Sequence, residues 1–171
     1  DEARPGKASR ESVTDWVNDR NVSAYENVVF IQPEDYFSSY EVIRLAKFVM
    51  IYNSTIGLEA SIMGAPVLCA GKARFTQLDT VFFPVSKYDY FAKLEEFISA
   101  DNIEVPENHR LNARRFLYYQ LFRTSLPFDR FLNPDEILPG FVRLKEFSLQ
   151  DLLPKNSEAL RVISEVLLQV K

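Results

Sequence analysis

Residues able to bind an anion and a sugar lie close together in the first half of the chain. Asn53, Ser54 and Thr55 follow an apolar run and precede a predicted helix over 56–63. Residues of these types cap helices, and the N–H groups and dipole at a helix start attract phosphate or carboxylate groups. Glu59 lies one turn into the helix, where its carboxylate could accept hydrogen bonds from two neighbouring ribose hydroxyls. The pattern therefore predicts a nucleotide site.

A second polar group follows the next apolar run, 67–70. Gly71, Lys72 and Arg74 lie there, and the two cations could neutralise charge on a departing diphosphate. Gly57, in the preceding helix, permits close approach of the backbone to a ligand. Plainer alternatives stay open: helix capping for the hydroxyl groups, and surface positions for the carboxylate and the two cations.

The elements that must position these residues alternate between strand and helix. The apolar run 48–52 is typical of a parallel strand covered on both faces, and Gly64 with Pro66 ends the helix that follows it. Further predicted elements are a helix over 9–20, a strand over 28–31, a helix starting at Ser38 or Ser39, a strand over 81–85, and helices over 86–99, 110–123 and 157–170. The alternation predicts the α/β class: a Rossmann-like three-layer domain with a parallel sheet and helices on both faces, plus carboxyl-terminal helices. Ligands bind beyond the carboxyl ends of such strands, where Asn53 and Gly71 fall.

Helical spacing also predicts which side chains are buried. Trp16 is expected in the core, and Phe91, Leu94 and Ile98 on the buried side of the helix over 86–99. The last predicted helix carries an apolar stripe of Leu160, Ile163, Val166, Leu167 and Val170. Before it, Pro127, Pro134, Pro139 and Gly140 predict an irregular connection.

Composition narrows the class of protein. The 171 residues are 47% hydrophobic and 26% charged, which suits one domain with a sizeable core. The net charge of −4 argues against a nucleic-acid partner, and no apolar run approaches the length of a membrane span. Cys69 is the only cysteine and lies in an apolar run, so we expect a buried structural thiol. His109 is the only imidazole and lies in a polar stretch, so we expect it to be solvated; we expect no metal site.

One segment resembles a known family. Residues 54–67 read Ser-Thr-Ile-Gly-Leu-Glu-Ala-Ser-Ile-Met-Gly-Ala-Pro-Val, which is similar to the ST-x-G-x-E-A-x-x-x-G-x-P-V motif in the donor lobe of GT-B glycosyltransferases that build bacterial capsule and surface polysaccharides. A softer likeness covers 28–98. The resemblance implies that the Ser54-Thr55 turn holds the donor's phosphate and that Glu59 holds its sugar-ring hydroxyls. It also implies that the loop over 71–75 closes over the donor.

The resemblance implies transfer of a sugar from a nucleotide-activated donor, CMP- or UDP-linked, to a glycan acceptor. The family's donor lobe usually begins with a strand ending in His-Pro, which this chain lacks, and the chain begins at Asp1. We therefore expect a carboxyl-terminal lobe of a larger cytoplasmic enzyme, inactive alone, with an acceptor bound through another lobe and no cofactor. Residues 1–132 are assigned to the nucleotide-sugar lobe and 133–171 to an extension whose final helix packs on it. No transmembrane segment is expected, and peripheral contact of the full-length protein with the inner face of the membrane stays open.

Two other functions remain open. A sugar-nucleotide epimerase shares the two-lobed architecture, and its product would form without an acceptor. A non-enzymatic interaction module would dock through the aromatic helix over 110–123 and the final apolar stripe. If the protein is such a module, we expect it to self-associate as its concentration rises and to bind no nucleotide.

Overall fold

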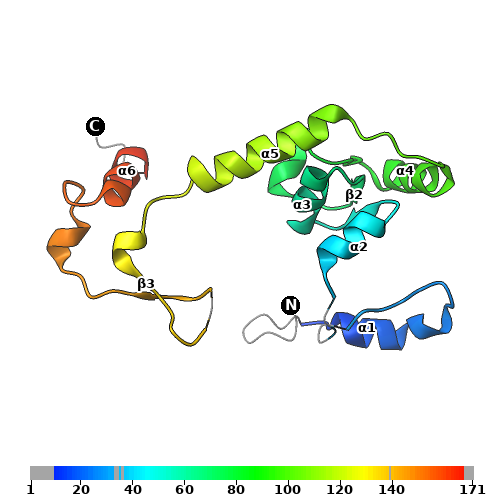
Figure 1. Cartoon of the computed structure of the whole chain (residues 1–171), viewed down its shortest axis with the longest axis horizontal. Helices are drawn as coiled ribbons and strands as arrows, with labels where there is room; N and C mark the ends of the chain where they lie inside the picture. The colour runs from blue at the N-terminus through cyan, green and yellow to red at the C-terminus, as the bar shows by residue number, and fades with distance from the viewer. Residues whose placement is uncertain (1–9, 33–34, 36, 139, 168–171) are drawn as a thin grey trace. The chain divides into compact units, whose positions relative to one another are not determined.

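A computed structural model describes residues 10–32, 35, 37–138 and 140–167 (Figure 1). The chain forms two compact units, Asp1–Ala113 and Arg114–Lys171. The predicted boundary between 132 and 133 falls inside the second unit, and the roles assigned to its two sides stay predictions.

Each unit has its own set of elements. The first unit contains α1 (Val13–Asp19), η1 (Val22–Ala24), α2 (Ser39–Leu45), β1 (Val49–Ile51), α3 (Ile56–Met63), β2 (Val67–Cys69), η2 (Arg74–Leu78) and α4 (Lys87–Ser99). Helix α5 (Glu107–Phe122) begins in the first unit and continues into the second. The second unit then contains η3 (Asp129–Phe131), β3 (Leu132–Pro134), β4 (Val142–Leu144), η4 (Leu149–Leu152) and α6 (Glu158–Leu167).

The centre of the first unit is a small parallel sheet. Strands β1 and β2 pair in parallel, with Val49 opposite Val67 and Ile51 opposite Cys69, and α3 forms the connection between them. Phe82 adds an isolated parallel bridge to Leu68 at the place of the predicted strand over 81–85. Helices α2, α3 and α4 lie around the strands (Figure 1). A mixed helix and strand structure with parallel pairing is thus confirmed, while the full three-layer Rossmann-like sheet stays a prediction.

Helix α3 begins and ends where the sequence predicts. It spans 56–63, and Gly64 ends it with a left-handed φ of 91°. A glycine fits this conformation because it lacks the Cβ that makes positive φ costly. Gly57 faces β1 so closely that an added Cβ would lie 2.2 Å from the Ile51 Cδ1 atom. The lack of a side chain at Gly57 therefore allows α3 to pack this closely on β1.

The core is built on β2 and on one phenylalanine of α4. All three residues of β2 are buried. The Phe97 side chain is 1% exposed, and its ring makes edge-on contacts with Phe48 and Phe82 at centroid distances of 5.4 and 5.0 Å. Lys47 ties the chain before β1 to the end of α4 by donating to the Ile98 carbonyl at 2.9 Å.

Two strand predictions need correction. Residues 28–31 form no strand, because Val28 donates its N–H to Tyr25 in a turn and the segment has no neighbouring strand to pair with among the described residues. Strand β1 was expected to be covered on both faces. Instead Ile51 is buried against α3, whereas Met50 and Tyr52 alternate to the other side and are exposed.

Helix positions are predicted well, but their buried faces are not. Helix α1 starts after Ser12, whose hydroxyl accepts hydrogen bonds from the N–H groups of residues 14 and 15. Its buried residue is Val17, and Trp16 is exposed, contrary to expectation. In α4, Phe91 and Ile98 are also exposed, because the contacts with Phe48 and Phe82 turn residue 97 inward.

The second unit contains a hairpin that the sequence did not predict. Strands β3 and β4 pair antiparallel, with Leu132 opposite Leu144, where an irregular connection was expected. The Asp135 carboxylate shapes the turn by accepting the N–H groups of residues 137 and 138 at 2.9 Å each and by pairing with Arg143 at 2.5 Å. These interactions hold the pKa of Asp135 below its ordinary value. Gly140 lies in the same turn with a φ of 85°. Pro139 of the predicted irregular connection and Val170 of the predicted apolar stripe lie outside the described residues.

Aromatic packing and one arginine hold the rest of this unit together. Phe131 is buried, with ring centroids 5.6 Å from Phe128 and 5.7 Å from Phe147. Arg130 pairs with Asp151 on η4 and donates to the Asn156 carbonyl just before α6. The final helix buries Ala159 but leaves Val166 of the predicted apolar stripe exposed.

Candidate functional site

The carboxyl ends of β1 and β2 lie side by side and are joined by hydrogen bonds. Ala70 donates its N–H to the Ile51 carbonyl at 2.9 Å, and Gly71 donates to the Tyr52 carbonyl at 2.6 Å. The Cys69 thiol donates to the carbonyls of Tyr52 and Gly71, at 3.1 Å each. The turn after β1 and the loop after β2 therefore begin next to each other, as the parallel arrangement predicts.

The turn after β1 presents polar side chains to solvent. Asn53, Ser54 and Thr55 are exposed. The N–H groups of residues 56–59 are already hydrogen-bonded to Ser54 or Thr55, at 3.0–3.4 Å. A phosphate at this turn would thus be held by the side chains and amides of 53–55 together with the helix dipole, rather than by the first amides of α3.

The loop after β2 supplies positive charge. Lys72 and Arg74 are exposed, and neither forms an ion pair with any described residue. Gly71 is buried beneath the Tyr52 ring, where an added Cβ would lie 2.9 Å from ring atoms. The glycine lets the loop turn closely against β1, so that the cations that follow it start beside the polar turn.

Gly57 differs from the other predicted phosphate-binding residues. It is buried, its N–H donates to the Ser54 carbonyl at 3.1 Å, and its Cα faces Ile51. The structure therefore gives this residue a packing role in the contact between α3 and β1.

Glu59 is half-buried on α3 and is held by a tyrosine from α2. Its Oε2 atom accepts a hydrogen bond from the Tyr40 hydroxyl. This hydrogen bond and the carboxylate's negative charge raise the pKa of Tyr40, so the phenol remains a donor at neutral pH. The Glu59 Oε1 atom has no hydrogen-bond partner in the described part of the chain and is left to accept one from a ligand.

Tyr40 was not predicted as a site residue. The two side chains are 19 positions apart in different helices, and no spacing rule links them. Only the packing of α2 beside α3 brings the phenol to the carboxylate.

Cys69 and His109 are both buried. The burial of Cys69 confirms the predicted structural thiol, whereas the burial of His109 corrects the prediction of a solvated imidazole. Burial raises the pKa of the Cys69 thiol, so the sulfur stays protonated and is no nucleophile at neutral pH. His109 was expected in solvent but is 7% exposed, with its ring 4.8 Å from Phe82 between centroids. The reason is that α5 begins at Glu107, earlier than predicted, which places residue 109 on the inner side of its first turn. Burial lowers the pKa of His109 and keeps the imidazole neutral.

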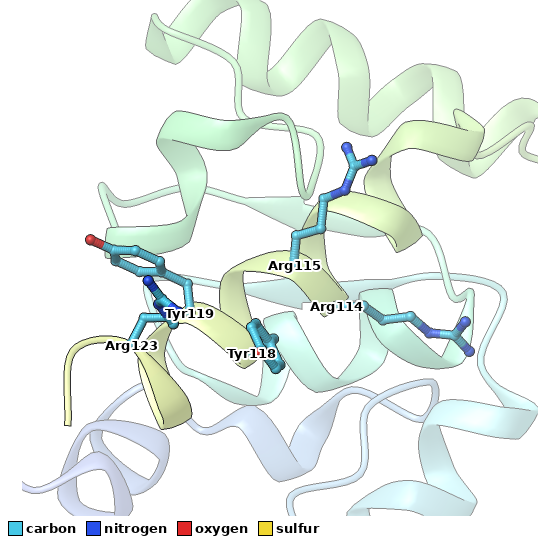
Figure 2. Close-up of a pocket in the computed structure, with 5 residues that line it drawn as sticks. All are labelled: Arg114, Arg115, Tyr118, Tyr119 and Arg123. Carbon is cyan, nitrogen blue, oxygen red and sulfur yellow. The ribbon is translucent and has the colours of Figure 1, made fainter.

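A separate pocket of about 410 Å³ lies on α5 in the second unit (Figure 2). Its lining residues are Arg114, Arg115, Tyr118 and Tyr119 of this helix and Arg123, which directly follows it. An aromatic helix was predicted here, but the arginines beside its aromatic residues were not predicted to take part in a site. None of the residues predicted to bind the donor lies in this pocket.

Within the described residues, no helix is both long and apolar enough to cross a membrane. The same residues contain no group of three or more histidine, cysteine, aspartate or glutamate side chains placed to hold a metal ion. No protein-family model, curated protein or solved structure matches the chain.

Proposed function

We propose that the first unit binds a nucleotide-activated sugar as the donor lobe of a GT-B glycosyltransferase of capsule or surface polysaccharide biosynthesis. The observation that carries this proposal is the joining of the two strand ends. One end supplies the hydroxyl groups of Ser54 and Thr55, and the other supplies Lys72 and Arg74, two cations without an ion pair in the described part of the chain. Such a pair of loops suits the diphosphate or phosphate of a nucleotide sugar.

The chemistry of the lobe is stabilisation of a leaving group. When the sugar is transferred, negative charge develops on the phosphate that departs with the nucleotide. Cations already placed beside that phosphate lower the barrier, because they need no rearrangement as the charge develops. In this proposal Lys72 and Arg74 provide that charge, and no catalytic base is assigned within the chain.

Glu59 and Tyr40 have a complementary role. The tyrosine fixes the carboxylate through Oε2, which leaves Oε1 for a sugar hydroxyl. A carboxylate held in one orientation binds a hydroxyl with less loss of side-chain freedom. This arrangement supports a ribose contact near the start of α3.

Ligand-observed NMR against CMP, UDP, GDP and ADP tests the proposal. The wild-type chain is expected to bind one or two of the four, and the variants Glu59→Ala and Lys72→Gln/Arg74→Gln are expected to lose most of that binding. Tyr40→Phe should weaken it several-fold, because the carboxylate is no longer fixed. Glu95→Ala, which removes an exposed carboxylate from α4, is the matched control and should bind as the wild type does.

Circular dichroism of each variant separates loss of binding from loss of the fold. If a folded Glu59→Ala variant and a folded double cation variant both bind as tightly as the wild type, the nucleotide site is not at these strand ends. Absence of binding to all four nucleotides by the wild-type chain would also contradict the proposal.

A further inference from the structure

The second unit exposes an unusual surface on α5, which we call the Arg-Tyr face. It consists of two rows with a spacing of four residues: Arg114, Tyr118 and Phe122, and Arg115, Tyr119 and Arg123, the last of which directly follows the end of the helix. Residues three or four apart are neighbours on a helix surface. The two rows therefore lie side by side and together cover about half of the helix circumference, and five of the six residues line the pocket in Figure 2.

The aromatic side chains of this face are mostly open to solvent. Tyr118, Tyr119 and Phe122 are 58%, 57% and 69% exposed, and the rings of Tyr118 and Phe122 lie 5.2 Å apart between centroids. Leu121, in the last turn of α5, and Leu126, in the segment that follows the helix, add exposed aliphatic surface. Contiguous apolar surface of this kind usually marks an interaction site.

The same face carries positive charge that no ion pair among the described residues neutralises. The sequence has no aspartate or glutamate between Glu107 and Asp129. Among the described residues, Arg114, Arg115 and Arg123 form no ion pair. Because the whole chain has a net charge of −4, this cationic surface is local rather than a property of the composition.

We propose that the Arg-Tyr face binds the surface of an anionic phospholipid bilayer, independently of the nucleotide site. Arginine head groups reach lipid phosphates, while tyrosine and phenylalanine rings settle at the level of the head groups. The exposed Leu121 and Leu126 distinguish this partner from a nucleic-acid strand. A strand would contact the arginines and rings but leave aliphatic side chains in water, whereas the acyl boundary of a bilayer accepts them.

Co-sedimentation with vesicles tests the proposal on the full chain. The wild type is expected to bind vesicles of equal parts phosphatidylcholine and phosphatidylglycerol and not vesicles of phosphatidylcholine alone. Each arginine near an anionic surface contributes about fivefold in affinity, so the triple variant Arg114→Gln/Arg115→Gln/Arg123→Gln should lose about a hundredfold. Raising the salt from about 0.1 to about 1 M should weaken wild-type binding strongly, because the screening length falls from about 10 to about 3 Å.

Two further variants separate membrane binding from simpler causes. Arg10→Gln/Arg20→Gln/Arg44→Gln removes the same charge from exposed positions elsewhere and should keep wild-type binding. Tyr118→Trp in a Trp16→Phe background places the only tryptophan in the Arg-Tyr face, where its emission should shift to the blue on anionic vesicles. Circular dichroism checks the fold of every variant.

Several results would overturn the proposal. The control triple variant could lose as much binding as the face variant, or both kinds of vesicle could bind equally. Inorganic polyphosphate could compete fully with vesicles while the tryptophan emission stays unshifted, which would indicate a soluble polyanion as the partner. Sedimentation could instead show a dimer that Phe122→Ser dissociates, without vesicle binding, and the face would then join two copies of the chain.

Discussion

The two units differ in what holds their strands in place. In the first unit, β2 is buried along its whole length and Phe97 is enclosed between two other phenylalanines. In the second unit, every residue of β4 is exposed, and its hairpin turn and 3-10 helices are fixed mainly by charged hydrogen bonds. A tightly packed sheet can hold two loops at fixed positions, as a phosphate site needs, whereas the second unit offers exposed surface for a partner.

The largest expected effect comes from matched phenylalanines, one in each unit. Phe97→Ala should cost about 3–5 kcal/mol of unfolding free energy, because it leaves a cavity among Phe48, Phe82 and β2. Phe141→Ala, at a side chain that is 63% exposed beside β4, should change it by less than about 0.5 kcal/mol. Urea unfolding followed by circular dichroism measures both. Equal losses would show that the two units are packed alike.

A glycine in the first unit should show a smaller effect. Gly57→Ala places a methyl group 2.2 Å from Ile51 Cδ1, the end of a side chain that can partly turn away, and should cost about 1–2 kcal/mol, because overpacking exceeds the gain in helix propensity. Combining it with Ile51→Val, which removes the clashing atom, should restore part of the loss. If Gly57→Ala alone is neutral or stabilising, the contact between α3 and β1 is looser than the structure indicates.

The two units should also differ in how stability depends on pH. Burial lowers the pKa of His109 in the folded protein below its value in the unfolded chain. At a pH between these two values, the imidazole is protonated in the unfolded chain but neutral in the folded protein, so lower pH favours unfolding. The stability of the first unit is then complete above about pH 6.5 and falls as the pH drops from there, by up to about 1.4 kcal/mol for each unit by which the pKa is lowered.

Urea unfolding at pH 7.5 and 5.5 tests this behaviour, and His109→Leu should abolish the difference, since the chain has no other histidine. The second unit should respond at lower pH. The pKa values of Asp135 and Asp151 are lowered by their hydrogen bonds, so their contribution is present above about pH 3.9 and disappears as the pH falls below it. A pH slope that survives in His109→Leu would assign the effect to other groups.

The smallest expected effect concerns the second unit's charged contacts. Arg130→Gln breaks the pairing with Asp151 and the bond to the Asn156 carbonyl, and should cost about 1 kcal/mol because these groups are partly exposed. Hydrogen exchange should show faster opening around η3 and η4 and unchanged protection of β1 and β2. Arg114→Gln, at an arginine without an ion pair among the described residues, is the control and should leave stability unchanged. A loss as large as that of Phe97→Ala would show that the second unit depends on this one arginine.

The sequence predicts what is decided locally. The carboxyl end of α3 follows from Gly64 and Pro66, and the start of α4 follows from Ser86, whose hydroxyl accepts the Asp89 N–H at 3.1 Å. Strand β2 is recognised because all its residues are apolar and are buried on both faces. Local rules of capping, turn formation and hydrophobicity are sufficient for these elements.

Features decided by distant contacts were not predicted. The burial of Phe97 instead of Phe91 depends on rings that lie far away in the sequence, and the Tyr40–Glu59 hydrogen bond depends on two helices packing together. The hairpin of β3 and β4 lies in a segment rich in prolines, whose turn is stabilised by a carboxylate that composition does not reveal. Of the candidate site, the polar turn and the cations could therefore be predicted, but not what holds Glu59.

The most direct test of the central claim is to map nucleotide binding on the backbone amides by NMR. Spectra of the labelled chain would be recorded during titration with the nucleotide that binds best among the four. We expect shift changes concentrated at 53–55 and 71–74, and a loss of these changes in Glu59→Ala. Changes confined to residues 114–123, or none at the two strand ends, would contradict a nucleotide site at the strand ends.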